Sequence, residues 1–393
     1  MGGPDIFILG TARTPMGGLQ GSLGSVPAAQ LGGAAIAAAL ARAGIAAATV
    51  DGVLMGCVLQ AGQGQAPARQ AGFAAGLGES VPATTLNKMC GSGMQAIVMA
   101  ADAIRAGSAR TLVAGGMESM TRAPYLLPKM REGARLGHGQ VLDSMFLDGL
   151  EDAYDRGEHG AGRLMGSFAE DCAAAFGFSR EAQDAYALAS LERARAAIAG
   201  DRFAAEIVPV TVAGRHGDTV ADTDEQPGSA RPEKIPLLKP AFRPGGTVTA
   251  ANSSSISDGA AALVVSDRAA GARARIVGHA GHARAPADFP TAPVPAARRL
   301  LDRIGWSVEE VDLWEVNEAF AVVPMAFMQG LGVPHERLNV NGGACALGHP
   351  IGASGARIVV TLLHALEARG LRRGVAAICI GGGEGLALAI ERV

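Results

Sequence analysis

The first 120 residues alternate between short apolar runs and longer stretches rich in alanine. Short apolar runs between turn-forming residues are typical of buried strands, and longer apolar stretches are typical of helices. This alternation favours an α/β fold with a mostly parallel sheet. We expect strands at 6–9, 50–59 and 111–115 (the last followed by a turn at 116–120), helices at 28–43 and 94–104, and another helix starting near 67–70.

The pattern changes between about residue 121 and residue 247. Proline, glycine, arginine and aspartate become frequent, and one clear helix is expected, at 180–199, with Ser179 as its N-cap. Residues 215–240 are polar and rich in proline, so we expect a loop there. An interruption of this length in an α/β pattern is typical of a lid or a binding subdomain.

The last third of the chain repeats features of the first. The segment 50–55 resembles 311–316, the elbow CGSG at 90–93 resembles GASG at 352–355, and LVAGG at 112–116 resembles ICIGG at 378–382. We infer an internal duplication that places two elbow helices side by side, with both elbows facing one central site. The expected elements are strands at 274–279, 311–316 and 375–380, a helix at 294–304, a helix at 317–329 broken by Pro324, and a helix running to 369 from a Gly-rich elbow at 341–355.

Composition excludes several classes of partner. The 393 residues are 49% hydrophobic and 18% charged, which is enough apolar material for a large core. A net charge of −3 argues against nucleic acid, which requires a basic face. No uncharged apolar run of about 18 residues predicts a membrane span, and the first ten residues lack the basic start of a signal peptide.

Cysteine and histidine usage indicates a reducing compartment and no metal site. The cysteines have no CxxC spacing, so we expect free thiols and a cytoplasmic protein. His279 and His282 are spaced three residues apart but lack a third ligand in the sequence, so no metal is expected. The five cysteines are Cys57, Cys90, Cys172, Cys345 and Cys379.

Cys90 lies in a Gly-rich bend just before an apolar helix. The unpaired N–H groups and positive dipole of a helix N-terminus favour an anion, so this thiol is expected to ionise more easily than usual. That is the environment of a cysteine nucleophile. The alternative is an inert buried cysteine, and the elbow alone does not decide between them.

Three features of the second half converge on Cys90 if the chain is duplicated. His349, in the equivalent elbow, is a candidate base, although a Gly-His-Pro triplet is more often a plain loop. Cys379 ends a strand and is a candidate for proton transfer, with the N–H of Gly381 beside it; a core cysteine is the alternative. Asn317 is a candidate to hold a water.

Glu318, the next residue, offers two other interpretations. Its carboxylate is either a functional group itself or a charge that stabilises the N-terminus of a helix.

Five motifs in a fixed order resemble the thiolases, the acyl-CoA C-acyltransferases, from residue 6 to the C-terminus. The resemblance implies two duplicated α/β halves in a five-layer αβαβα arrangement, with an inserted CoA-binding loop domain. The implied boundaries are 1–121 (completed by about 247–270), 122–246 and 271–393. The expected assembly is a homodimer or homotetramer, and we expect the loop-rich segment 122–139 to contribute to its contacts. The motifs are NKMCGSG at 87–93, GGMESM at 115–120, NEAFA at 317–321, ALGHPIG at 346–352 and CIGGG at 379–383.

The resemblance also implies a reaction and a role for each candidate residue. Two acetyl-CoA condense reversibly to acetoacetyl-CoA and CoA, or a 3-ketoacyl-CoA is cleaved by CoA, through an acyl-cysteine and without a metal or cofactor. Cys90 would be acylated, and His349 would activate it. His349 and a water on Asn317 would form one oxyanion hole, the amides of Cys90 and Gly381 would form the other, and Cys379 would be the acid/base.

The CoA contacts are implied by position, and here the chain departs from the family pattern. LMG at 164–166 stands where His-Met-Gly is common, so Leu164 replaces a polar contact, and an extra run precedes it at about 157–162. Pro227 replaces an arginine that often meets the CoA 3′-phosphate, and a Ser-Ser pair replaces Ser-Gly after Asn252. The implied contacts are Leu150, Met165, Phe242, Ala250, Ser254, Ala319 and Phe320, with Arg231 or Lys234 in place of the missing arginine.

Several alternatives to an acetoacetyl-CoA thiolase stay open at this point. A longer-chain 3-ketoacyl-CoA thiolase of fatty-acid β-oxidation is one alternative, because the sequence does not give the chain length of the substrate. A ketoacyl-synthase-type condensing enzyme would have no acid/base cysteine, so Cys379 argues against it. An inactive scaffold is disfavoured because Cys90, His349 and Cys379 are all present.

Overall fold

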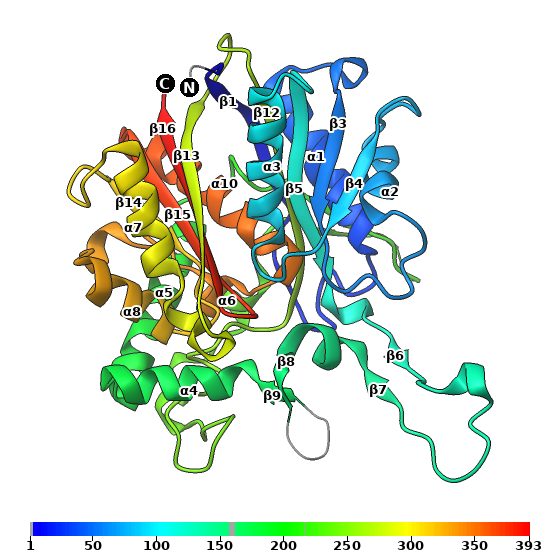
Figure 1. The fold of residues 1–393 in the computed structure, drawn as a ribbon, viewed down its shortest axis with the longest axis vertical. Helices are drawn as coiled ribbons and strands as arrows, with labels where there is room; N and C mark the ends of the chain where they lie inside the picture. Colours follow the sequence, from blue (N-terminus) through cyan, green and yellow to red (C-terminus); the bar gives the residue numbers. More distant parts are fainter. Residues whose placement is uncertain (1–2, 157–161, 216) are drawn as a thin grey trace.

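A ten-stranded mixed sheet runs through the molecule in this computed structural model, which describes residues 3–156, 162–215 and 217–393 (Figure 1). The extra run predicted at 157–162 therefore lies almost entirely outside the described residues. The strands follow the order β4-β3-β5-β12-β1-β13-β16-β15-β14, and β2 pairs with β12. Their bounds are β1 Ile6–Arg13, β2 Gly17–Gly18, β3 Gly52–Gly56, β4 Ala83–Leu86, β5 Thr111–Ser119, β12 Ser257–Ser266, β13 Ala274–Ala283, β14 Leu313–Val316, β15 Arg373–Ile380 and β16 Glu384–Arg392.

Strand pairing confirms the internal duplication. In the first half β3 pairs parallel with β5, β5 antiparallel with β12, and β12 antiparallel with β1. In the second half β14 pairs parallel with β15, β15 antiparallel with β16, and β16 antiparallel with β13. The halves join where β1 pairs with β13. The parallel pairing of β4 with β3 also has a partial counterpart in the second half, where Leu338 forms a single parallel bridge with Trp314 of β14.

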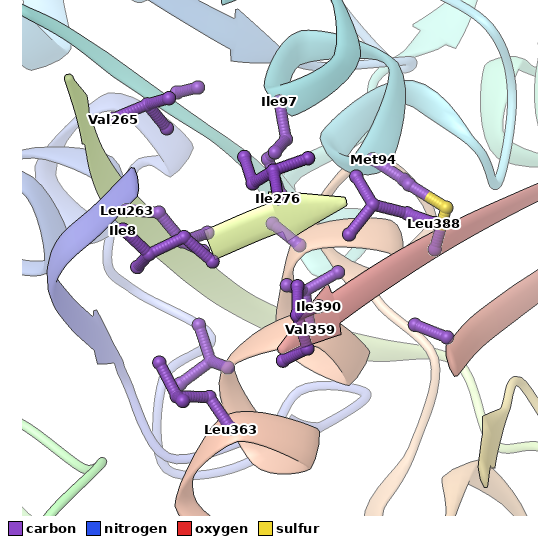
Figure 2. Packing of buried hydrophobic residues seen from close by; sticks show 14 of the residues in the cluster. Ile8, Met94, Ile97, Leu263, Val265, Ile276, Val359, Leu363, Leu388 and Ile390 are labelled. Atoms are coloured by element: carbon purple, nitrogen blue, oxygen red, sulfur yellow. The ribbon is translucent and has the colours of Figure 1, made fainter. Parts of the chain in front are cut away.

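Helices on both faces of the two half-sheets give the expected five layers. The helices α3 (Ser92–Arg105) and α10 (Ile351–Arg369) form the central layer, where Met94, Ile97 and Val359 pack against strands of both halves (Figure 2). Outer layers are α1 (Ala28–Ala43) with α2 (Pro67–Ala74) on the first half and α7 (Pro293–Ile304) with α8 (Val322–Leu331) on the second.

The segment between β5 and β12 lies outside the main sheet. Its two long helices pack beneath the second half, and the β6–β7 excursion extends away from the body (Figure 1). Buried Arg13 of β1 anchors the segment through contacts to Glu206 at 2.5 Å and Asp224 at 2.6 Å. The elements are β6 Tyr125–Leu126, β7 Leu142–Asp143, β8 Glu151–Arg156, β9 Gly162–Leu164, α4 Met165–Phe176, α5 Arg180–Ala199, β10 Val210–Val212, β11 Thr219–Ala221, α6 Glu225–Ser229 and the short helical turns Phe146–Leu150 and Pro232–Leu237.

Helices were predicted better than strands. The bounds of α1 and α5 are as expected, and Ser179 caps α5 by accepting from the N–H of Ala182 at 3.2 Å. The turn expected at 116–120 is wrong, because pairing with β12 carries β5 on to Ser119. The break expected at Pro324 is also wrong: α8 starts at Val322, so the proline lies in the first turn, which tolerates it.

Several elements were not predicted at all. The strands β4, β12 and β16 and the helix α4 are absent from the expected pattern, and the expected loop at 215–240 contains β11 and α6. β12 is buried on both faces and built mostly from small residues, so it lacks the alternation that identifies a half-buried strand.

The helix α10 is the one helix of the described residues that is long and apolar enough to cross a membrane. Its best 18-residue window has a mean hydropathy of 1.2, but 89% of that window is buried inside the fold. Its apolar character is therefore explained by its place in the central layer.

Glycines let the two central helices approach within backbone contact. A Cβ placed on Gly93 of α3 would lie 2.7 Å from the backbone nitrogen of Ala356, and one on Gly355 of α10 would lie 2.6 Å from that of Met94. Real Cβ atoms do not approach backbone this closely, so both positions require glycine. This reciprocal contact sets the spacing of the two elbows.

We predict that Gly93→Ala destabilises the protein by about 2–3 kcal/mol, because the added methyl group overpacks a backbone contact. Gly72→Ala in α2 is the matched control: its Cβ would have 3.6 Å to the nearest side-chain atom, so the usual helix preference for alanine should stabilise by about 0.5–1 kcal/mol. Urea unfolding measures both. Equal effects of the two substitutions would contradict the close-contact role of Gly93.

Candidate functional site

The two elbows meet at a mostly apolar cavity of about 410 Å³. Cys90 from the first elbow, His349 from the second and Gly381 after β15 all line it. Three segments far apart in sequence thus bring a thiol, an imidazole and a glycine amide to one wall, as the duplication predicted.

A network of short hydrogen bonds shapes the first elbow. The hydroxyl of Ser92 accepts from the N–H of Lys88 at 2.8 Å and donates to the carbonyl of Met89 at 2.6 Å. Met89 has φ = 47°, a left-handed conformation that is strained for a residue with a side chain. The bend therefore holds Cys90 at the start of α3 at some cost in backbone energy.

The expectation that Cys90 ionises easily is wrong in direction for the resting site. Burial raises the pKa of its thiol to about 11, although the N–H groups of Gly381 and of Cys90 itself oppose that rise. The helix N-terminus does supply donors to the sulfur, but desolvation outweighs them. These two amides are the pair assigned to an oxyanion hole, and both lie beside the sulfur.

The hydrogen bonds of the second elbow fix the tautomer of His349. The hydroxyl of Ser354 donates its one proton to the carbonyl of Pro350 at 2.9 Å, so it accepts from Nδ1–H of His349, which lies 2.5 Å away. Nε2 then carries a lone pair and has no hydrogen-bond partner among the described residues. Burial, with a smaller contribution from Arg357, lowers the pKa of His349 to about 3. The imidazole is thus a neutral acceptor.

Cys379 and Asn317 do not line the cavity themselves, but each lies two residues before a residue that does, Gly381 and Ala319 respectively. Both are fully buried, and burial together with the nearby charge of Cys90 raises the pKa of the Cys379 thiol. The two thiols are therefore close enough to influence each other. Neither polar atom of the Asn317 amide has a partner among the described residues, so both are available to a water.

Two buried glutamates support the site without lining the cavity. Glu318 accepts hydrogen bonds from Tyr186, Ser190, Asn339 and the N–H of Cys345, at 2.7–3.0 Å. It is not a charge at the N-terminus of a helix, because α8 starts only at Val322, and its hydrogen bonds brace the segment that leads into the second elbow.

Glu118 connects the loop after β3 with the second elbow. Its carboxylate accepts from the N–H groups of Val58, Leu59 and Gly352 at 2.9–3.1 Å. Burial raises its pKa to about 7, and these donors oppose the rise. The side chain thus ties the loop after β3 to the first turn of α10.

Seven of the nine predicted CoA contacts line the catalytic cavity, and the two basic residues do not. Arg231 and Lys234 line a neighbouring cavity of about 310 Å³ that shares Ala250, Ser253 and Ser255 with the first. Pro227 is buried, and its carbonyl accepts from Arg195 at 2.8 Å. The seven are Leu150, Met165, Phe242, Ala250, Ser254, Ala319 and Phe320.

Sequence reasoning missed two residues that shape the cavity. Phe289 lines it and packs edge-to-face with Phe320, at 6.3 Å between ring centroids. It lies in a short turn with no periodicity that would signal it. Ser354 was detectable, because it is the counterpart of Ser92 in the duplicated elbow.

Within the described residues there is no group of three or more His, Cys, Asp or Glu side chains that could hold a metal. His279 pairs instead with Asp102 at 3.0 Å.

Comparison with known proteins agrees with this architecture. Residues 6–269 match the model of the thiolase N-terminal domain, and residues 270–392 match that of the thiolase C-terminal domain. An acetyl-CoA acetyltransferase of Pseudomonas aeruginosa is 49% identical, and the match covers 99% of each chain. One of Escherichia coli is also 49% identical, over 98% of each chain.

Solved structures show the same likeness. The crystal structure of a Bacillus anthracis acetyl-CoA acetyltransferase superposes with a TM-score of 0.95 at 39% identity, covering 100% of this chain and 99% of that one. The Acat5 thiolase of Ascaris suum, solved in complex with coenzyme A, has a TM-score of 0.92 at 40% identity over 99% of this chain and 100% of its own. The chain therefore belongs to the thiolase family.

Proposed function

We propose that this protein is an acetyl-CoA C-acetyltransferase that condenses two acetyl-CoA molecules to acetoacetyl-CoA and CoA, and runs the reverse thiolysis. The observation that carries the proposal is that Cys90 and His349 line the same apolar cavity. The Cys90 sulfur lies beside two backbone amides, and Nε2 of His349 has no hydrogen-bond partner among the described residues. The acetyl-CoA acetyltransferases at 49% identity support the same substrate.

The first half-reaction forms the acyl-enzyme. Nε2 of His349 accepts the Cys90 proton as the thiolate attacks the thioester carbonyl, and the amides of Cys90 and Gly381 hold the resulting oxyanion. A single well-aimed donor of this kind typically contributes about 3–4 kcal/mol. The tetrahedral intermediate then collapses, and CoA leaves with a proton from Cys379.

The second half-reaction makes the carbon–carbon bond. The Cys379 thiolate removes a Cα proton from a second acetyl-CoA, and the enolate oxygen is held by Nε2–H of His349 and a water on Asn317. The enolate attacks the acyl group, and Cys90 departs and regains its proton from His349. Every proton removed in these steps is returned by Cys379 or His349, and the proposed reaction uses no metal or cofactor.

The remaining assignments follow from the same site. Arg231 and Lys234 are proposed to meet the phosphates of CoA, which is supported by their cavity sharing Ala250 with the catalytic cavity. A fatty-acid thiolase acting on longer chains is the second candidate, favoured by Leu164, an apolar side chain in the cavity wall. Five free cysteines support a reducing compartment, so we assign the protein to the cytoplasm.

We propose that the chain forms a homodimer or homotetramer through the β6–β7 excursion, among other contacts. Tyr125, Leu127, Leu136 and Val141 on this segment are 58–97% exposed, which is costly for large apolar side chains in an isolated chain. Gel filtration with light scattering should therefore show an oligomer that Leu136→Asp weakens. A wild-type monomer would contradict this assignment.

We predict that Cys90→Ala abolishes the acyl-enzyme. Intact-protein mass spectrometry after mixing with acetyl-CoA should show the gain of one acetyl group on the wild type and none on the variant, because no other thiol lies between two oxyanion donors. Cys172→Ala, a buried cysteine that does not line the cavity, is the matched control and should keep the gain. A gain that persists in Cys90→Ala would refute the nucleophile.

A further inference from the structure

One ion pair joins the two segments that supply the amides beside the Cys90 sulfur. Lys88 precedes Cys90 in the first elbow, and Glu384 is the first residue of β16, directly after the glycine turn at 381–383. The Lys88 ammonium contacts the Glu384 carboxylate, although the two residues are 296 positions apart in the sequence. The pair therefore connects the two duplicated halves of the chain next to the elbow of the nucleophile.

The turn that carries the Gly381 amide has no side chains of its own to hold it. Residues 381–383 are all glycine, and Gly382 and Gly383 have positive φ values of 92° and 88°. Glycine has the widest conformational freedom of all residues. The direction of the Gly381 amide therefore depends on contacts made at the two ends of the turn, and Glu384 lies at one of these ends.

Both members of the pair are attached to a well-ordered backbone. The N–H and the carbonyl of Lys88 are both hydrogen-bonded within the first elbow, at 2.8 and 3.1 Å. Glu384 pairs with Ile380 of β15 and with Ala283 of β13, so it has a strand on each side. A side-chain contact between two fixed backbones restricts their relative position, which a contact between two mobile loops would not do.

Packing beside the pair restricts the same separation from the other direction. A Cβ placed on Gly91 would lie 2.5 Å from Cδ1 of Ile380, so the elbow lies directly on the last residue of β15. This contact limits how closely the elbow can approach the turn, and the ion pair opposes its moving away. Together the two contacts restrict the distance between the N–H of Cys90 and the N–H of Gly381.

We propose that Lys88 and Glu384 are positioning residues, which hold these two amides at the separation that the oxyanion of the acyl-transfer steps requires. The inference rests on the proposed function and deepens it. Neither side chain belongs to the described lining of the catalytic cavity, so both act through the backbone. A donor contributes only when it points at the place where charge develops, and a displacement of about 1 Å can cost about a hundredfold in rate.

An ion pair of this exposure contributes little to the stability of the fold. The side chains of Lys88 and Glu384 are 26% and 39% exposed, so water and salt screen their attraction. Removal of the pair should therefore leave the unfolding temperature almost unchanged while it slows catalysis. This combination distinguishes a positioning role from a general stabilising role.

Single-turnover acetylation by acetyl-CoA tests the proposal in Lys88→Met and Glu384→Gln, which remove one charge each but keep most of the side-chain bulk. The rate at which the intact mass gains one acetyl group should fall about tenfold in each variant, less than the loss of a whole oxyanion donor would cost. The double variant should be no slower, because the two residues act as one unit. Lys88→Arg keeps the positive charge and should retain most of the rate.

Proton exchange supplies a second readout that separates positioning from a general loosening of the site. In the proposed reaction, exchange of the acetyl-CoA methyl protons into deuterated solvent uses His349 and the water on Asn317 rather than the two amides. Once each variant is fully acetylated, its exchange rate should therefore stay close to that of the wild type. A site that had merely loosened would lose both rates together.

Glu310→Gln is the matched control. Glu310 pairs with Arg373 at 2.7 Å, with side chains that are 47% and 30% exposed, and Arg373 lies at the opposite end of β15 from the glycine turn. Loss of this pair should change neither acetylation nor exchange, because no oxyanion donor lies beside it.

The outcomes separate this inference from the proposed function. Wild-type acetylation rates in both single variants would overturn the positioning role and leave the proposed function intact. Additive losses in the double variant, or equal slowing of acetylation and exchange, would overturn it as well. A wild-type protein that gains no acetyl group would overturn the proposed function itself.

Discussion

The close approach of Gly93 to Ala356 and of Gly355 to Met94 is the constraint on which the rest of the structure depends. It brings the backbones of α3 and α10 together, and it does so from equivalent positions of the two duplicated halves. Each helix begins in an elbow, so the distance between the helices sets the distance between Cys90 and His349. Glu118 adds a second connection near the elbows. Its carboxylate accepts hydrogen bonds from both the loop after β3 and the first turn of α10.

Burial imposed by that packing decides the resting chemistry of the site. It raises the pKa of the Cys90 thiol and lowers that of the His349 imidazole, so both changes favour a neutral pair over a thiolate and an imidazolium. The resting Cys90 is thus a neutral thiol rather than a thiolate. In the proposed reaction the thiolate forms as the thioester arrives, and two amides already lie beside the sulfur. Such preorganised donors require no rearrangement during the reaction.

Much of this arrangement could be predicted from the sequence, because the duplication leaves readable repeats. The paired elbows at 90–93 and 352–355 predicted both the central helix pair and the meeting of Cys90 with His349. The features that were not predicted depend on tertiary packing. β12 is built from small residues buried on both faces, so it has no strand periodicity. The direction of the Cys90 pKa shift escaped too, because a helix N-terminus is visible in sequence while desolvation is a property of the packed site.

We propose that two thiols, one from each half, share the chemistry: Cys90 carries the acyl group and Cys379 transfers the proton. The most direct measurement takes Cys379→Ser and follows acetylation by intact mass together with exchange of the acetyl-CoA methyl protons into deuterated solvent. The account predicts that the acetyl group still appears on the protein while exchange is lost, because a serine hydroxyl is too weak an acid to supply the base. Rapid exchange in that variant would contradict it.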